Sequence, residues 1–90
     1  MDFELKIKKV HALREYTRQD GTQGCARTII LTEDANTAYP DELVANCYGD
    51  MARNFNYAEG TKHRFSLRFS IKQYGEGFVG QNINIDKIAD

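Results

Sequence analysis

Long apolar runs and cysteines are both scarce in this chain of 90 residues. No stretch is long enough to span a bilayer, and the opening residues MDFELKIKK contain no apolar run of signal-peptide length. We therefore expect a cytoplasmic protein that does not enter a membrane. The two cysteines, Cys25 and Cys47, are too few and too far apart for a metal knuckle or a redox motif. We interpret them as buried free thiols, with a disulfide as the less favoured alternative.

Excess charge is also absent, because 12 basic residues nearly balance 13 acidic ones and the net charge is −1. Nucleic-acid-binding domains usually have a high isoelectric point, so the net charge alone does not indicate that function. The length allows one small core, and 41% hydrophobic residues is sufficient for a globular fold. We expect residues 1–90 to form a single domain.

The glycine-rich stretch GEGFVG, residues 75–80, matches the G-x-G-x-x-G pattern of dinucleotide-binding loops. In that motif a helix follows the loop and points its N-terminus at the pyrophosphate. Here the following residues, QNINIDKIAD, alternate between polar and apolar with the strand period of two. We therefore interpret the glycines as the turn of a β-hairpin between two long strands.

Period-two alternation predicts five strands, at about residues 3–12, 25–32, 42–48, 61–73 and 78–88. In the first strand the apolar parity changes after Lys8 and Lys9, which predicts a bulge of the kind that bends strands at barrel corners. Residues 13–24 and 33–41 are polar and turn-rich, and we expect loops there. Residues 51–59 have helical spacing. With Asp50 as N-cap and Gly60 closing the helix in the left-handed conformation, about two turns are expected.

The resulting order, β-β-β-α-β-β, predicts an all-β fold, the five-stranded OB-fold barrel. An SH3-like barrel is the main alternative, but it has no helix at this point. The run YGDMARNFNYAEGTKHRFSLRFSIKQYGEG, residues 48–77, resembles the second half of bacterial single-stranded DNA-binding proteins. It resembles still more closely a small bacterial family of single-strand-binding-like (SSB-like) OB domains common in gut Bacteroidetes. The resemblance covers nearly the whole chain, through pattern more than identity.

The strand predicted at residues 61–73 separates apolar from basic side chains. Phe65, Leu67, Phe69 and Ile71 share one face, which we expect to be core. The other face has cations and no acid, and its neighbours in an OB barrel carry cations at corresponding outer positions, which predicts one positive surface for phosphates. The alternative is that these charges are solvated and protect a long strand. The candidate phosphate-binding residues are Lys6, Lys8, Arg27, Arg64, Arg68 and Lys72.

Exposed aromatic side chains are the second requirement for binding a single strand, since stacking contributes roughly 1–3 kcal/mol per base. Tyr48 is predicted to point outward, like Asn46 two residues before it. The resemblance implies that Tyr48 and Tyr74, which precedes the glycine turn, stack on bases. Phe78 and Tyr16, in or beside the flanking loops, are further candidates. The alternative is that Tyr48 and Tyr74 are partly buried against a loop or a subunit.

The residues that would support catalysis do not form groups in the sequence. His11 and His63 are isolated from cysteines and carboxylates, metal-ligand spacing is absent, and no cofactor is indicated. We therefore expect a non-enzymatic module that binds single-stranded nucleic acid, DNA before RNA. The resemblance implies a homodimer or homotetramer formed through the first or fourth strand.

The alternative function is an OB-fold protein-interaction module that does not bind nucleic acid. The weak net charge and the absence of tryptophan favour that alternative. The sorting of charges and the positions of the tyrosines favour nucleic-acid binding.

Overall fold

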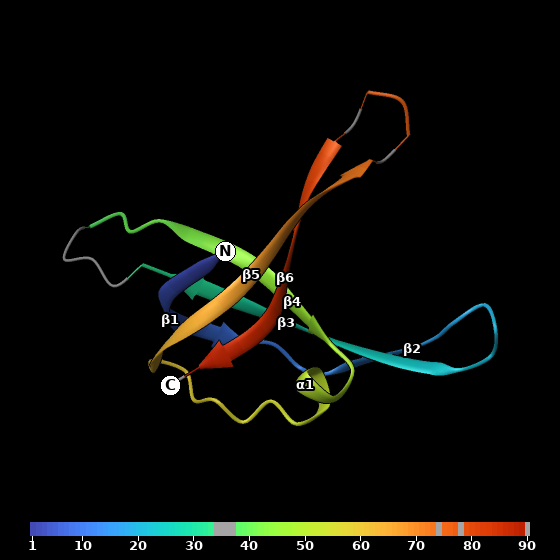
Figure 1. The fold of residues 1–90 in the computed structure, drawn as a ribbon, viewed down its shortest axis with the longest axis horizontal. Coiled ribbons are helices and arrows are strands. Elements are labelled where there is room, and N and C mark those ends of the chain that lie inside the picture. The colour runs from blue at the N-terminus through green and yellow to red at the C-terminus, as the bar shows by residue number, and fades with distance from the viewer. Residues whose placement is uncertain (34–37, 74, 78, 90) are drawn as a thin grey trace.

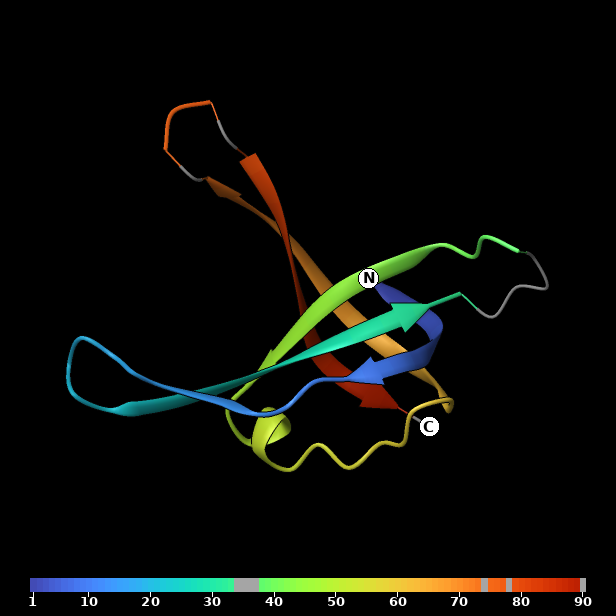
Figure 2. The same cartoon turned by 180° about the vertical axis from the view of Figure 1, so that it is seen from behind.

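Alternating apolar and polar residues fold this chain into a barrel from which two hairpin arms project (Figures 1 and 2). The computed structural model describes residues 1–33, 38–73, 75–77 and 79–89. The elements are β1 (Asp2–Val10), β2 (Arg14–Thr17), β3 (Gln23–Thr32), β4 (Glu42–Tyr48), α1 (Asp50–Arg53), β5 (Lys62–Gln73) and β6 (Val79–Ala89).

The sheet has the strand order β1-β5-β6-β4-β3-β2, and a further pairing of β1 with β3 closes five of these strands into a barrel. The pairing of β4 with β6 is parallel, and the other pairings are antiparallel. The helix lies between β4 and β5 in the chain. The predicted order of five strands and one helix is therefore confirmed, and β2 is an additional short strand within the first predicted loop.

The barrel closes because β1 bends part-way along its length. Its first half pairs with β5 from Asp2 to Lys6, and its second half pairs with β3 from Lys6 to Val10. The register with β3 shifts between Ile7 and Lys9, which confirms the predicted bulge. A bulge bends and twists its strand, so one strand can serve two neighbours.

The core fills the barrel and takes buried side chains from β1, β3, β4, β5, β6 and α1. Cys25 and Cys47 are both buried in it, as predicted. Their Sγ atoms lie 3.2 Å from the carbonyl oxygen of Gly49 and 3.7 Å from that of Arg27, respectively. Burial raises the pKa of the Cys47 thiol, although the charge of Arg27 opposes this shift. The remaining buried apolar residues are Ile7, Ala26, Ile29, Leu31, Ala45, Ala52, Phe65, Leu67 and Ile85.

The predicted core face of β5 is buried only along its first half. Phe65 and Leu67 are buried, but Phe69 is 38% exposed and Ile71 is 73% exposed, so the prediction of a core position is wrong for these two. Met1 exchanges backbone hydrogen bonds with Leu67 at 2.7 and 3.0 Å, which marks the end of the contact with β1. Beyond this point β5 continues with β6 as an arm that leaves the barrel.

The second arm, formed by β2 and β3, occupies a segment that the sequence predicts to be a loop. Its turn is closed by Asp20, whose carboxylate accepts hydrogen bonds from the hydroxyl and the backbone N–H of Thr22 at 2.6 and 3.0 Å. These bonds lower the pKa of the Asp20 carboxyl. The sequence correctly predicts turn-forming residues within 13–24. The turn is tight enough, however, that Arg14–Thr17 pair with the start of β3 instead of forming part of a loop.

The helix is shorter than predicted and ends at Arg53. Asp50 is its first residue, and the N-cap position belongs to Gly49. Gly60 has the expected left-handed conformation, with φ 90°, but it shapes the turn before β5, where its N–H donates to the carbonyl of Ile7 at 2.7 Å. Asn54 and Asn56 follow Arg53, and asparagine is a weak helix former. The chain then bonds to β1 at Gly60 and Thr61, whose backbones pair with Ile7. Within the described ranges, no helix has the length and apolarity needed to cross a membrane.

Candidate nucleic-acid interface

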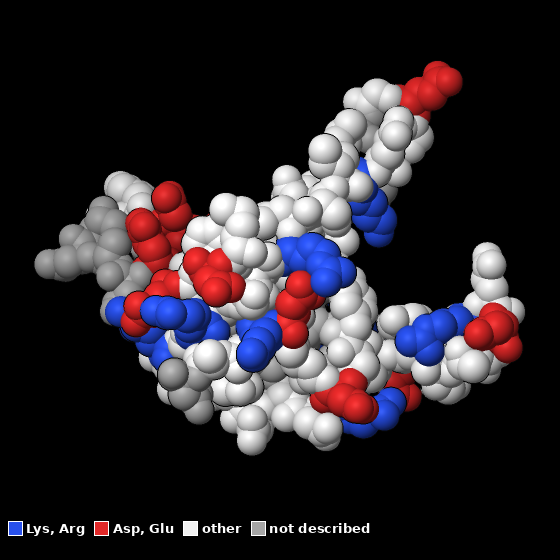
Figure 3. Space-filling model, viewed as in Figure 1, with Lys and Arg blue, Asp and Glu red and all other residues white. Residues whose placement is uncertain are grey.

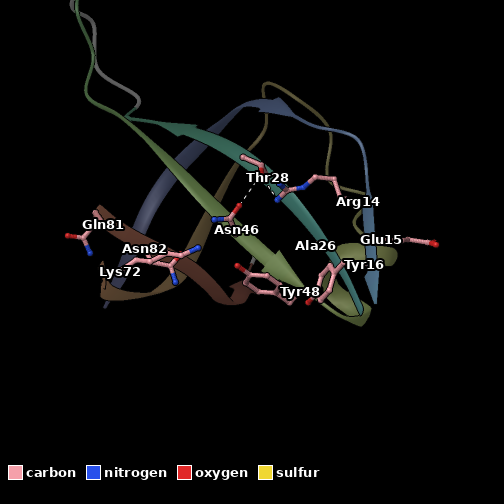
Figure 4. Close-up of a pocket in the computed structure, with 10 residues that line it drawn as sticks. All are labelled: Arg14, Glu15, Tyr16, Ala26, Thr28, Asn46, Tyr48, Lys72, Gln81 and Asn82. Atoms are coloured by element: carbon pink, nitrogen blue, oxygen red, sulfur yellow. Dashed lines mark hydrogen bonds between the residues drawn. The ribbon is translucent and has the colours of Figure 1, made fainter. Parts of the chain in front are cut away.

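A groove of about 530 Å³ lies on the outer face of the barrel, at the roots of the two arms. Figure 3 shows the hollow between the arm of β5 and β6 and the arm of β2 and β3. Figure 4 shows the side chains that line it. They are Arg14, Glu15, Tyr16, Ala26, Thr28, Asn46, Tyr48, Lys72, Gln81 and Asn82.

The two tyrosines of the groove are placed by strand register. Tyr16 on β2 is opposite Gly24 of β3, and Tyr48 on β4 is opposite Ala26 of β3. Gly24 and Ala26 are two residues apart and share one face of β3, so both tyrosines flank β3 on that face. Tyr16 is 40% exposed and Tyr48 is 46% exposed, so both rings are accessible from the groove.

The floor of the groove beside the tyrosines is polar. Thr28 and Asn46 are cross-strand partners on β3 and β4, and the Thr28 hydroxyl donates to Asn46 Oδ1 at 2.9 Å. Arg14 donates from Nη2 to Thr28 Oγ1 at 3.1 Å, so its guanidinium is held at the β2 side of the groove. The floor of the groove therefore offers hydrogen-bonding groups beside the two tyrosine rings, and the guanidinium of Arg14 is held next to these groups.

The opposite wall belongs to the arm of β5 and β6. Lys72 is directly opposite Gly80, and Ser70 is opposite Asn82. Gln81 donates from Nε2 to the Ser70 carbonyl at 2.8 Å, and the Asn82 amide lies 3.4 Å from the Ser70 hydroxyl. This wall therefore adds a second cation and two amides to the groove.

The other predicted cations lie away from the groove. Arg27 donates to the carbonyl oxygens of Ala52 and His11 at 2.9 and 3.3 Å, so its guanidinium joins β3 to α1 and to the segment after β1. Lys6 is half-buried on β1, and Arg64 lies on β5 near Lys87. The structure brings neither of them to the groove lining.

The prediction of one positive surface along β1 and β5 is wrong. Lys8 forms an ion pair with Glu42 at 2.5 Å, and Arg68 forms one with Asp86 at 3.1 Å. Figure 3 shows red and blue side chains interspersed over the barrel. The cations do share outer positions on their strands, but Asp86 of the adjacent strand β6 lies beside Arg68, and Glu42 of β4, on the far side of β3, pairs with Lys8.

Of the ten predicted residues, the groove thus holds Tyr16, Tyr48 and Lys72. Tyr74 and Phe78 lie outside the described residues. The polar groups that sequence reasoning missed are those of Arg14, Thr28, Asn46, Gln81 and Asn82. The parity that pointed Tyr48 outward applied equally to Asn46, and this was the one available signal for the floor.

Metal binding finds no support in the part of the chain that the structure describes, since no group of three potential ligands from His, Cys, Asp and Glu lies together there. His63 lies against the rings of Tyr57 and Phe65, with centroid distances of 4.7 and 6.2 Å, and 2.8 Å from the Thr61 hydroxyl. Aromatic packing accounts for this histidine. Stacking and hydrogen bonding are what the groove itself can provide.

No protein-family model matches the sequence, and no curated protein matches it either. Among solved structures, the chain is similar to the second OB-fold domain of replication protein A from Methanococcus maripaludis. The TM-score is 0.69 at 20% identity, with 98% of this chain and 79% of that chain covered. It is also similar to the SSB domain of a protein from Synechococcus sp., with a TM-score of 0.65 at 11% identity, covering 100% of this chain and 92% of that one.

This chain has the OB-fold. Its five-stranded barrel and the position of α1 match the predicted order of elements, and the parallel β4–β6 pair belongs to the same closed sheet. At these identities the likeness concerns the fold alone, because one fold supports many functions. The function of this OB-fold must be argued from its groove.

Proposed function

We propose that this OB-fold chain binds single-stranded nucleic acid, DNA before RNA, in the groove between its two arms and without catalysis. The placement of Tyr16 and Tyr48 carries the proposal, because two exposed rings on one face form a platform on which successive bases stack. Arg14 and Lys72 stand on opposite walls, where phosphates of a strand lying along the groove would meet them. The OB-fold domains of replication protein A and of the SSB protein support this choice of ligand.

The test is a titration of a labelled oligo-dT by fluorescence polarisation at two salt concentrations. We expect saturable binding that weakens steeply as salt rises, since phosphate contacts release counterions. Replacing both Tyr16 and Tyr48 by alanine should weaken binding by at least about tenfold, because each stacking contact contributes roughly 1–3 kcal/mol. Tyr39→Ala is the matched control: Tyr39 is 90% exposed and does not line the groove, so this variant should bind like wild type.

The second candidate function is docking of another polypeptide on the same face. Glu15 in the groove lining favours this second function, as do the acids that pair with Lys8 and Arg68, because a carboxylate repels the negative charge of a phosphate. Absence of oligo-dT binding at low salt would reject the nucleic-acid proposal and leave the protein-interaction module. Binding that Tyr16→Ala and Tyr48→Ala leave unchanged would reject the stacking platform.

We also propose that the chain forms a homodimer or homotetramer through the arm of β5 and β6. Ile71 and Val79 are 73% and 66% exposed, and an apolar face on a two-stranded arm is typical of an association surface. Sedimentation velocity across protein concentrations tests this. A species heavier than one chain that Ile71→Lys converts to monomer is expected, and a monomer at every concentration would contradict it.

A further inference from the structure

A chain of hydrogen bonds orients the amide of Asn46 in the groove (Figure 4). Arg14 donates to Thr28 Oγ1, and Thr28 Oγ1 lies 2.9 Å from Asn46 Oδ1. A guanidinium has donors and no acceptor, so the Thr28 oxygen must accept from Arg14, and its own proton is available for Asn46. The Asn46 carbonyl oxygen therefore accepts from Thr28, which fixes the orientation of the amide and turns its –NH2 group away from Thr28.

Asn46 is also a neighbour of Tyr48 on the face of β4 that lines the groove. The two residues are two positions apart on β4, point to the same outer face and both line the groove. Arg14 begins this chain of hydrogen bonds on the β2 side of the groove. Its cross-strand partner is Ala26, which is also the cross-strand partner of Tyr48. The stacking surface and the oriented amide thus belong to neighbouring rows on one face of the sheet.

We propose that Asn46 reads the edge of the base stacked on Tyr48 as a hydrogen-bond donor, and that the groove therefore prefers uracil and thymine to cytosine. This inference rests on the proposed function, since it requires a base on Tyr48. Asparagine amides are common partners of base edges. An amide with both of its ends unbonded would not discriminate in this way, because it could rotate to present either its donor or its acceptor.

The preference follows from the exocyclic groups of the two pyrimidines. Uracil and thymine carry carbonyl acceptors at positions 2 and 4, so a donor meets an acceptor in either orientation of the ring. Cytosine carries one carbonyl and one amino group, and in one of its two orientations the amino group faces the Asn46 –NH2. Two donors that face each other leave both groups unsatisfied, which disfavours that orientation.

The experiment compares oligo-dU with oligo-dC in the polarisation assay, because the two bases have the same size and differ in the keto–amino exchange at position 4 and in the N3 proton that accompanies it. Wild type is expected to bind oligo-dU about three- to tenfold more tightly, the range of one net hydrogen bond. Asn46→Asp replaces the amide donor with carboxylate acceptors and should abolish or reverse the preference for oligo-dU over oligo-dC. Asn56→Asp adds the same charge at an exposed position outside the groove lining, and it should lower both affinities equally.

The hydrogen-bond chain from Arg14 through Thr28 to Asn46 is tested by changing Thr28. This second test also applies if Asn46→Asp fails to fold. Thr28→Val removes the hydroxyl that orients the amide, so the ratio should fall toward one while oligo-dU still binds. Thr28→Ser keeps the hydroxyl and should keep the ratio. Equal affinities of wild type for oligo-dU and oligo-dC, or a ratio unchanged in Asn46→Asp or Thr28→Val, would overturn the base reading and leave the proposed function standing. Binding to neither oligonucleotide would overturn both.

Discussion

The ring of Tyr16 lies against the backbone of Gly24, its cross-strand partner, so closely that a Cβ at position 24 would be 2.5 Å from the ring carbon Cε2. Gly24 is buried, and the ring of Tyr16 covers it. The guanidinium carbon of Arg18 lies 5.8 Å from the centroid of the same ring, within the range of a cation–π contact. Gly24 therefore provides the space that seats Tyr16 at the groove.

Gly24→Ala is expected to weaken oligo-dT binding by about three- to tenfold, because the added methyl displaces the Tyr16 ring from its position and part of the stacking energy is lost. The measurement is the dissociation constant by fluorescence polarisation. In a Tyr16→Ala background the same change should have no further effect, since the ring that it displaces is gone. Additive effects of Gly24→Ala and Tyr16→Ala would show that position 24 acts by another route.

Lys72 is predicted to contact a phosphate, and this contact has a signature in the salt dependence. Lys72→Gln should lower the slope of log affinity against log salt by about 0.7, the value for one phosphate of a single strand. Lys87→Gln removes the same charge from β6 at an exposed position outside the groove lining, so it should leave the slope unchanged. Equal slopes for wild type and Lys72→Gln would contradict a phosphate contact at Lys72.

The strands and the bulge were predictable because they follow from neighbours in the sequence. Parity alone pointed Ala45 and Cys47 inward and Tyr48 outward, and the structure confirms all three. The parity change after Lys8 and Lys9 likewise marked the bend in β1. These features depend on which face a residue occupies, and alternation specifies the face.

The arm and the charge pairs were not predictable, because parity does not say what covers a face. Ile71 has the parity of a core residue, but the contact of β5 with β1 reaches only to Leu67, which bonds to Met1, so β1 does not cover Ile71. Arg68 has the parity of an outer residue, but Asp86 of the neighbouring strand lies beside it. The seat of Tyr16 depends in the same way on the register of β2 with Gly24. Each outcome is decided by the neighbouring strand and its register.

The exposure of Ile71 leads to a prediction for stability. Ile71→Ser should change the free energy of unfolding of the monomer by less than about 0.5 kcal/mol, as is usual for exposed positions. Leu67→Ala on the same face should cost about 2–5 kcal/mol, because Leu67 is buried and its loss leaves a cavity. Urea unfolding at low protein concentration measures both. A cost for Ile71→Ser that appears only at high concentration would instead reveal burial of Ile71 between subunits, and a cost at every concentration would contradict its exposure.

The buried thiol of Cys47 predicts a loss of stability in alkaline solution. Because burial raises the pKa of this thiol, the folded chain keeps the proton at pH values where the unfolded chain has lost it. The stabilisation is therefore complete below the unfolded thiol pKa of about 8.5 and is lost as the pH rises through the higher folded value. Urea unfolding of wild type and of Cys47→Ala between about pH 7 and 10, the range in which a thiol ionises, measures how the free energy of unfolding depends on the Cys47 thiol. The free energy of unfolding of wild type should fall more steeply with pH than that of the variant, whatever the cavity costs at neutral pH. Parallel curves would show that the thiol ionises equally readily in both states, so burial would not have raised its pKa.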